Sequence, residues 1–310
     1  MTEFAWLASY PKSGNTWFRL LIANLAAGDE PVDINAMPER GGIASGRGDF
    51  HFHTLIDSGL LTHDEADALR PRVYEAIAGE DGGDGSDDDS GGRDGTRLPR
   101  LIKAHDAYLA SPLGEPLLAA ARGASRAILL VRDPRDIAAS LANHRHSTID
   151  AAIDFLIDRE ACFAASARGQ NTQLRQRLLD WSGHAASWLN QRDLPLHLVR
   201  YEDLMAAPVQ TFAAALGFLG CAIADDKVAR AVDFASFDRL QAQEKARGFA
   251  EWRSRQGGGL FFRRGESQGW RRELTREQAR RIEAAHAPMM ARLGYSAKAD
   301  GADLCASGDL

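Results

Sequence analysis

Residues 4–17 read FAWLASYPKSGNTW, a short apolar run followed by a turn and the polar start of a helix. An apolar run of this length, bounded by turn residues, predicts a buried strand. The glycine turn would aim unpaired backbone N–H groups and a helix N-terminus at one point, which is typical of an anion-binding loop. Lys12 precedes Gly14 and the loop is short, so the stretch differs from the nucleoside-triphosphate loop GxxxxGK[ST]. An ordinary strand–helix turn with a solvated lysine is the alternative.

The rest of the chain alternates further apolar runs with helical patterns. We predict strands at residues 4–10, 98–103, 127–131 and 196–201. We predict helices at residues 16–27, 62–78, 134–144, 172–191, 208–219 and 276–293. Leu174, Leu178, Trp181, Ala185 and Trp188 recur at helical spacing and are expected in the core. This alternation predicts an α/β fold, an open doubly wound parallel sheet flanked by helices in a single domain over residues 1–310.

The charge is unevenly distributed along the 310 residues. There are 37 basic and 43 acidic side chains, a net charge of −6. Residues 80–95 contain seven acids and one arginine, so this stretch accounts for the whole net charge and the remaining chain is neutral. Its composition predicts a disordered acidic insert that could be deleted without loss of the fold.

The cysteines and the N-terminus bear on the compartment. Three cysteines without a CxxC pair argue against a disulfide framework or a thiolate metal site. The first residues show no signal-peptide pattern, and no apolar run approaches the length of a membrane span. We therefore expect a cytoplasmic protein without a membrane span.

In open α/β sheets, ligands bind beyond the carboxyl ends of the strands. After the first strand, the junctions read KAHD at 103–106, VRDPRD at 131–136 and RYEDL at 200–204. In the second of these, Asp133 is the expected helix N-cap, while Arg132 and Ser140 could hold a phosphate. A helix cap with a surface arginine is the alternative. Glu202 and Asp203 are expected to order the following turn and cap a helix.

Residues 247–272 form a cationic stretch, with seven arginines, two glutamates and six glycines. Aromatic side chains are interleaved with the arginines, including FF at 261–262 and Trp270. The composition suits either a loop that covers an anionic ligand or a contact with single-stranded nucleic acid.

Together these segments resemble the cytosolic sulfotransferases, which use 3′-phosphoadenosine 5′-phosphosulfate (PAPS) as the sulfuryl donor. YPKSGNTW at 10–17 resembles the family's 5′-phosphosulfate loop, and VRDPRDIAAS at 131–140 its 3′-phosphate element. FFRRGESQGW at 261–270 resembles the C-terminal RKGxxGDW signature, KAH at 103–105 the KxH catalytic pair, and LVRYEDL at 198–204 another strand end. The resemblance extends from about residue 4 to residue 295 and implies a P-loop-like sulfotransferase fold.

The resemblance also implies roles for individual residues. The 5′-phosphosulfate would be held by Lys12, Ser13, Gly14, Asn15 and Thr16, with Trp17 stacked on adenine. The 3′-phosphate would be held by Arg132, Ser140, Arg263, Arg264 and Gly265, and the adenine site completed by Tyr201 and Phe237. No metal is implied.

The implied reaction is in-line attack of an acceptor oxygen or amine on sulfur, with adenosine 3′,5′-bisphosphate (PAP) as the leaving group. His105 would act as general base, and Lys12 would stabilise the charge on the bridging oxygen. Lys103 would neutralise the sulfuryl oxygens, and Ser140 could restrain Lys12 until an acceptor is present. The chain has 32 arginines and only five lysines, yet both of these catalytic cations are lysines. This agrees with a reaction that needs a localised ammonium charge and not the broad guanidinium of arginine.

The acceptor is expected to be a small molecule or a glycan, and nucleic acid is not expected as a partner. The segment at 272–283 lacks the family's dimerisation motif, so the resemblance does not establish the oligomeric state. His51 and His53 have the i, i+2 spacing of a possible metal site, but the sequence offers no third ligand. We therefore expect these two histidines to lie in the wall of the acceptor pocket or on the surface, without a metal. The alternatives are a P-loop nucleotide kinase, which the absence of GxxxxGK[ST] disfavours, and a non-enzymatic nucleotide- or nucleic-acid-binding protein.

Overall fold

The structure is a computed structural model that describes residues 4–27, 29–37, 42–79, 98, 100–118, 124–166, 172–252 and 259–295. Within these ranges, no helix combines the length and the apolar character needed to span a bilayer. The acidic insert predicted at residues 80–95 lies outside the described residues.

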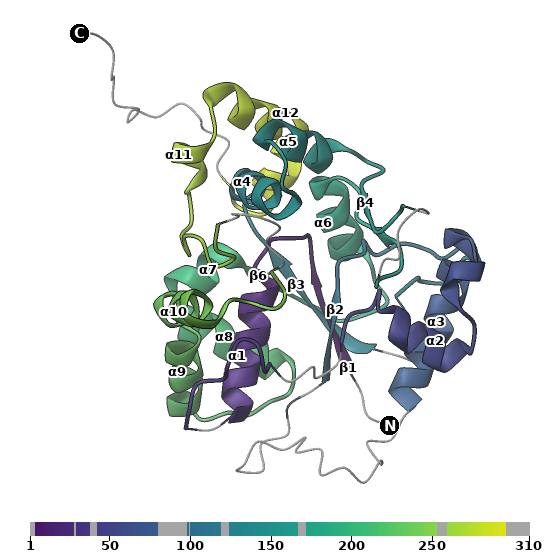
Figure 1. The fold of residues 1–310 in the computed structure, drawn as a ribbon, viewed down its shortest axis with the longest axis horizontal. Helices are drawn as coiled ribbons and strands as arrows, with labels where there is room; N and C mark the ends of the chain where they lie inside the picture. Colours follow the sequence, from purple (N-terminus) through teal and green to yellow (C-terminus); the bar gives the residue numbers. More distant parts are fainter. Residues whose placement is uncertain are drawn as a thin grey trace.

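The centre of the molecule is a four-stranded sheet in which all neighbouring strands run parallel (Figure 1). The strands are β1 (Phe4–Ser9), β2 (Arg100–Ala104), β3 (Ala124–Val131) and β6 (Leu196–Arg200). Their order across the sheet is β2-β1-β3-β6. Strand β2 therefore lies on one side of β1, and β3 and β6 lie on the other side. All four predicted strands and the predicted α/β class are confirmed, and the carboxyl ends of the strands lie at one edge.

Both faces of the sheet are covered, because successive residues of the central strands point to opposite sides. Phe4, Trp6 and Ala8 belong to one hydrophobic core, and Ala5 and Leu7 belong to the other. The first core also contains side chains from α4, α5, α6 and α12, and the second contains side chains from α1, α8 and α9. Figure 1 shows these helices packed around the sheet. Burial on both faces explains why β1 reads as an uninterrupted apolar run.

Five predicted helices are present within a residue or two of the predicted ends. They are α1 (Asn15–Ala27), α3 (His63–Gly79), α4 (Pro134–Arg145), α8 (Pro208–Phe218) and α12 (Arg276–Arg292). Local signals set these ends: Asp133 caps α4 by accepting from Arg135 N, and Thr275 and Gln278 form a capping box on α12. The other described helices are α2 (Arg47–Thr54), η1 (Ser58–Leu60), α5 (Ile149–Ile157), α6 (Trp181–Asn190), α7 (Tyr201–Ala206), α9 (Asp225–Phe234), α10 (Phe237–Arg247) and α11 (Trp270–Glu273).

The helix predicted at 172–191 is wrong in its first half. Helix α6 begins only at Trp181, and β5 (Gln176–Arg177) pairs antiparallel with β4 (Cys162–Phe163). The backbone here bonds to distant segments: Leu174 N donates to Ser45 O at 2.7 Å, and Leu178 N donates to Ala161 O at 2.9 Å. These tertiary bonds outweigh the helical periodicity of the apolar residues. The five predicted core residues of this stretch are nevertheless all buried.

The outer edge of β2 is covered by an irregular segment that begins at Gly42. Lys103 N donates to Gly42 O at 3.1 Å, and Ala44 N donates to Lys103 O at 2.8 Å. This pairing brings residues 42–49 alongside the end of β2, beside Lys103 and His105.

Candidate active site

The loop between β1 and α1 presents free backbone donors. Lys12 and Gly14 both have left-handed backbone, with φ of 70° and 99°. The first hydrogen bond of the helix runs from Phe18 N to Gly14 O at 3.0 Å, which leaves the N–H groups of the first turn without helical acceptors. A Cβ at Gly14 would lie 2.8 Å from the ring of Tyr201, so this position requires glycine.

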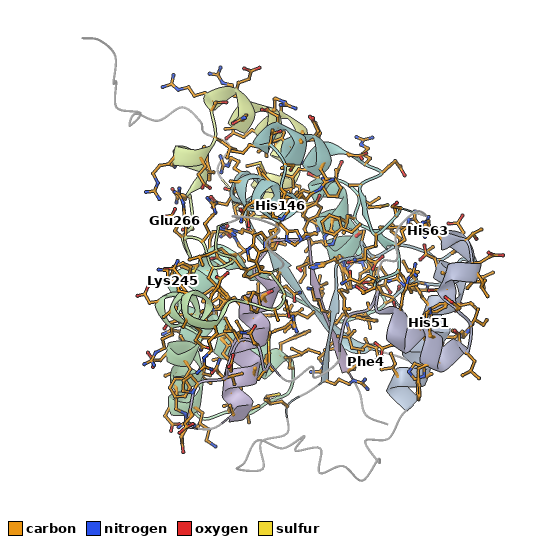
Figure 2. All side chains as sticks on the ribbon, viewed as in Figure 1. Phe4, His51, His63, His146, Lys245 and Glu266 are labelled. Atoms are coloured by element: carbon orange, nitrogen blue, oxygen red, sulfur yellow. The ribbon has the colours of Figure 1, made fainter. Side chains whose placement is uncertain are left out.

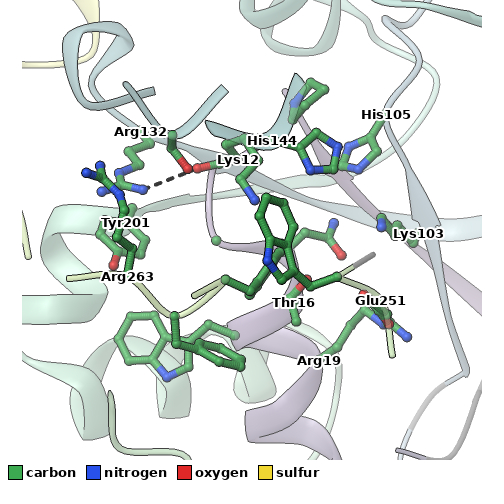
Figure 3. A pocket seen from close by; sticks show the side chains of 18 of the residues that line it. Lys12, Thr16, Arg19, Lys103, His105, Arg132, His144, Tyr201, Glu251 and Arg263 are labelled. Atoms are coloured by element: carbon green, nitrogen blue, oxygen red, sulfur yellow. Dashed lines mark hydrogen bonds and ion pairs between the residues drawn. The ribbon is translucent and has the colours of Figure 1, made fainter. Parts of the chain in front are cut away.

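Several buried polar atoms in this region have no protein partner among the described residues. Ser13 Oγ and Arg132 Nε are donors that an anion could satisfy, and the others near the loop are Tyr10 OH and Asn15 Oδ1. Arg132 is nonetheless fixed in place, since its Nη1 donates to Lys12 O at 3.4 Å and its Nη2 to Glu266 O at 3.2 Å (Figure 3). Buried donors without partners are costly unless a ligand satisfies them. The loop and Arg132 therefore fit an anionic group such as the phosphates of PAPS.

Aromatic side chains line the same cavity on the side of α7 and α10. The Trp17 ring is 5.7 Å from the Tyr201 ring, and Trp17 Nε1 donates to Ala235 O at 2.9 Å. The guanidinium of Arg132 lies 4.1 Å from the centre of the Tyr201 ring. These contacts fix flat apolar surfaces next to a cation, an arrangement that suits a nucleotide base and its phosphate.

The segment before α11 closes this part of the cavity. Gly265 has φ of 59°, and a Cβ there would lie 2.1 Å from the ring of Phe237, so the glycine is required for the close approach. Arg263 is paired with Glu273, with Nη2 2.8 Å from Oε2. Arg264 is exposed and weakly paired, 3.4 Å from Glu273 and 3.5 Å from Glu266. Two of the three arginines assigned to the 3′-phosphate, Arg263 and Arg264, therefore already have carboxylate partners, whereas Arg132 donates to backbone carbonyls.

Lys12 is held by aromatic rings. Its Nζ lies 4.0 Å from the centre of the Phe261 ring and 6.0 Å from that of Trp252, in cation–π contact. Burial, together with the charges of Arg132 and Lys103, lowers the pKa of Lys12 to about 7. Burial likewise lowers the pKa of Lys103 to about 8. A cluster of partly desolvated cations is a strong attractor for a polyanion.

His105 has a fixed tautomer. Its Nδ1 donates to Ser9 O at 2.8 Å, which leaves the Nε2 lone pair available. Asn15 Nδ2 donates to Ser9 Oγ at 3.1 Å and to Leu7 O at 3.2 Å, and so ties the start of α1 to the same strand. Burial, and secondly the Lys103 charge, hold the pKa of His105 well below its usual range, so the ring is neutral at pH 7. A neutral imidazole with a free Nε2 can accept a proton.

The structure brings nearly all predicted site residues to one cavity of about 900 Å³ (Figure 3). Its lining includes Lys12, Gly14, Asn15, Thr16, Trp17, Lys103, His105, Arg132, Ser140, Tyr201, Phe237, Arg263, Arg264 and Gly265. Ser13 is buried within the loop itself. The cavity thus joins the four strand-end junctions with the cationic C-terminal stretch.

Several residues of this region were not predicted from the sequence as part of the site. Asp136 accepts from Gln268 N and Trp270 N, both at 2.8 Å, and so fastens the C-terminal segment to α4. His144 lines the cavity near Lys12 and Lys103, and its pKa falls to about 4 through burial and these charges. Sequence pattern could have identified Asp136 as an acid in the first turn of a helix, but not its distant partners.

Glu202 has a different position from the one expected. Its Oε1 accepts from Asp133 N at 2.9 Å, and its Oε2 accepts from Tyr295 OH at 2.9 Å. It therefore links the end of β6 to the end of β3, next to Arg132. The turn that follows is closed by Asp203 instead, since Ala207 N donates to Asp203 O at 2.9 Å.

No cluster of three or more His, Cys, Asp or Glu side chains suited to a metal occurs in the part of the chain that the structure describes. His51 belongs to α2, toward the α3 side of the molecule and away from His146 (Figure 2). Its Nε2 accepts from Ser58 N at 3.0 Å, so the ring has a structural partner.

A family model described as the sulfotransferase domain matches residues 93–294, well over half of the chain. The chain belongs to the sulfotransferase family. The predicted fold, and the prediction of a PAPS-dependent sulfotransferase, are thereby confirmed.

Solved structures with the same fold include other sulfotransferases. Mouse sulfotransferase SULT7A1 complexed with PAP is 18% identical, with a TM-score of 0.55, over 94% of this chain and 85% of that one. Retinol dehydratase in a complex with retinol and PAP is 17% identical, with a TM-score of 0.56, over 92% and 80%. Retinol dehydratase with androsterone and inactive cofactor PAP is 15% identical, with a TM-score of 0.54, over the same shares. No curated protein sequence matches the chain significantly.

Proposed function

We propose that this sulfotransferase transfers the sulfuryl group of PAPS to a hydroxyl or amine of a small-molecule or glycan acceptor and releases PAP. One observation carries the assignment of donor and site. The buried, unpartnered donors of Ser13 and Arg132 lie beside the free N–H groups of α1, at the cavity that also contains Lys12 and His105. We propose a cytoplasmic location, because the three cysteines show no disulfide pattern, as is usual for proteins of a reducing compartment.

The residues of the cavity divide into two groups around Lys12. The loop at residues 12–16, Arg132, Ser140 and residues 263–265 would hold the phosphates, with Trp17, Tyr201 and Phe237 around the base. Lys103 and His105 lie on the β2 side, with residues 42–49 and His144 beyond them. The acceptor would therefore enter from the β2 side.

When bound, PAPS supplies a sulfuryl group activated by a good leaving group. His105 would take the acceptor proton on Nε2, since its Nδ1 proton is held by Ser9 O. Lys12 would stabilise negative charge on the departing oxygen, and Lys103 would neutralise the sulfuryl oxygens. Ser140 would orient Lys12. The rings of Phe261 and Trp252 lie beside the Lys12 ammonium and would limit its contact with water.

The test is a binding experiment followed by a turnover experiment. Calorimetry should show stoichiometric binding of PAP, and incubation with PAPS and a panel of phenols, alcohols, amines and glycosides should release PAP only when an acceptor is present. A folded protein that binds neither PAP nor PAPS would refute the proposal. Magnesium-dependent phosphoryl transfer from ATP would point to a kinase instead.

A further inference from the structure

The acceptor side of the cavity is built from three segments that are far apart in the sequence. Residues 42–49 pair with the edge of β2, and residues 172–174 pair with them in turn: Leu174 N donates to Ser45 O at 2.7 Å, and Arg47 N donates to Thr172 O at 3.3 Å. The end of α4 contributes His144 and His146. Most of the groups that these segments present to the cavity are polar.

Gln176 has an unsatisfied acceptor at this place. The residue is only 2% exposed, yet it lines the cavity. Its Nε2 donates to Gln173 Oε1 at 2.6 Å, whereas its Oε1 is buried and has no partner among the described residues. A buried amide oxygen of this kind is costly unless a ligand donates to it.

The neighbouring contacts hold Gln176 close to the proposed base. Arg177 N donates to Asp106 Oδ1 at 3.0 Å, and Ala107 N donates to Arg177 O at 2.7 Å. Asp106 follows His105 directly and is fully buried in an ion pair with Arg70 at 2.7 Å. Gln176 therefore lies on a short strand that is hydrogen-bonded to the residues following β2.

Phe163 adds an apolar surface next to this amide. It is the partner of Gln176 in the β4–β5 pair, and its ring stacks on Phe155 at 5.4 Å with an interplanar angle of 20°. A second cavity of about 390 Å³ adjoins the first and shares Phe163, Gln173 and Gln176 with it. The acceptor side thus continues outward, past His144, into space larger than one alcohol group needs.

From this geometry we propose that the acceptor is a polyhydroxylated molecule of the sugar type. One hydroxyl would donate to Gln176 Oε1, and the C–H face of the ring would lie on Phe163. A purely apolar alcohol would leave the amide oxygen unpaired. This inference rests on the proposed function, because it assigns the specificity of the same site.

The experiment compares acceptors that share one apolar tail. PAP release from PAPS is measured with 1-hexanol and with the hexyl glucoside, galactoside and mannoside. At least one glycoside should exceed hexanol in kcat/KM by about tenfold or more. The variant Gln176→Leu should lower kcat/KM for that glycoside about tenfold, mainly through KM, because one buried hydrogen bond is lost. Its kcat/KM with hexanol should not fall, because hexanol has no second hydroxyl to donate to Gln176, and its affinity for PAP should stay within about twofold.

The control is Gln210→Leu, at an exposed glutamine of α8 that does not line either cavity. This variant should leave kcat/KM unchanged for both the glycoside and hexanol. The inference would be overturned if hexanol had a kcat/KM equal to or above that of every glycoside, if neither class were turned over, or if Gln176→Leu lowered kcat/KM equally for both. In each of these cases, PAP binding by the unaltered protein would leave the proposed function standing. Absence of PAP binding in the unaltered protein would overturn both. The comparison of glycosides with hexanol uses the wild-type protein, so it can overturn the inference even if Gln176→Leu does not fold.

Discussion

Lys12 combines three features that are individually uncommon. Its backbone is left-handed, its ammonium contacts an aromatic ring at 4.0 Å, and its neighbours include Arg132 and Lys103. The left-handed backbone and the neighbouring cations cost energy in the ligand-free protein, through strain and repulsion, whereas the cation–π contact partly offsets the desolvation of the ammonium. A bound anion would relieve the repulsion, so Lys12 is prepared for an anionic ligand.

Replacement of the two central residues should separate chemistry from folding. We expect Lys12→Ala to lower kcat by about 10²–10³-fold, the cost of losing one electrostatic contact in a transition state. His105→Ala should lower it by about 10²–10⁴-fold, the usual contribution of a general base. Steady-state PAP release and circular dichroism measure the two effects. Lys245→Ala, on exposed α10 (Figure 2), is the control, and a near-normal rate in His105→Ala would remove the base assignment.

The affinity for PAP should depend on pH in a defined direction. In the free protein the pKa of Lys12 is about 7 and that of Lys103 about 8, and a bound phosphate favours both ammonium forms. Binding is therefore accompanied by proton uptake, and the affinity should fall as the pH rises from 7 to 9. Calorimetry in buffers of different ionisation enthalpy measures the uptake. A flat affinity over this range, or proton release, would contradict the assignment of the two lysines.

At the scale of elements, the C-terminal segment is held by backbone contacts to other parts of the fold. Asp136 in the first turn of α4 accepts from two of its N–H groups, and Gly265 packs against Phe237 at the start of α10. Arg132 at the end of β3 donates to Glu266 O. The segment that would cover the nucleotide is thus positioned by helices and a strand more than 20 residues away in the sequence.

Removal of the Asp136 carboxylate should release that segment. We expect Asp136→Ala to weaken PAP binding by about tenfold or more, since the backbone donors of Gln268 and Trp270 lose their acceptor, and that of Trp270 is buried. Asp136→Asn keeps one acceptor oxygen and should have a smaller effect. Calorimetry with PAP measures both variants, and Asp226→Ala on exposed α9 is the control. Unchanged affinity in a folded Asp136→Ala would show that the segment is positioned without this contact.

At the scale of the whole molecule, the two half-buried lysines, Lys12 and Lys103, make folding depend on pH. Their pKa values of about 7 and 8 in the folded protein lie below the value of about 10.4 in an unfolded chain. Between these values the unfolded chain binds more protons than the folded one, so raising the pH favours folding. The destabilisation is fully present below pH 7 and is relieved as the lysines deprotonate.

We therefore expect the urea midpoint of the ligand-free protein to rise between pH 7 and pH 9 through these two groups. The double variant Lys12→Met, Lys103→Met should show a smaller rise and a higher midpoint at pH 7. The difference between the two proteins isolates the lysines from tyrosines and cysteines that titrate at higher pH. Parallel pH profiles would mean that the ammonium groups are better solvated than their surroundings indicate.

Much of the fold could be read from local patterns. The strands appear as short apolar runs, and Asp133 with Pro134 and Thr275 with Gln278 mark helix starts by their own chemistry. The exception, at residues 172–180, shows the limit of this approach: the apolar spacing there is helical, but the backbone bonds to Ser45 and Ala161. A periodicity reports which side chains are buried, and the conformation that buries them depends on neighbours.

The sequence by itself determined the sheet, its order of alternation with helices and the polar junctions after the strands, because strand and helix signals are local and parallel strands bring their carboxyl ends to one edge. Only the tertiary structure decided which groups face each other across that edge. The contacting partners are separated by 69 to 249 residues in the chain: Glu202 and Asp133, Asp136 and Trp270, and Phe261 and Lys12. Gln176 is likewise held beside the end of β2 by the bond of its neighbour Arg177 to Asp106. Contacts over such separations depend on how whole elements pack, and no local pattern encodes them.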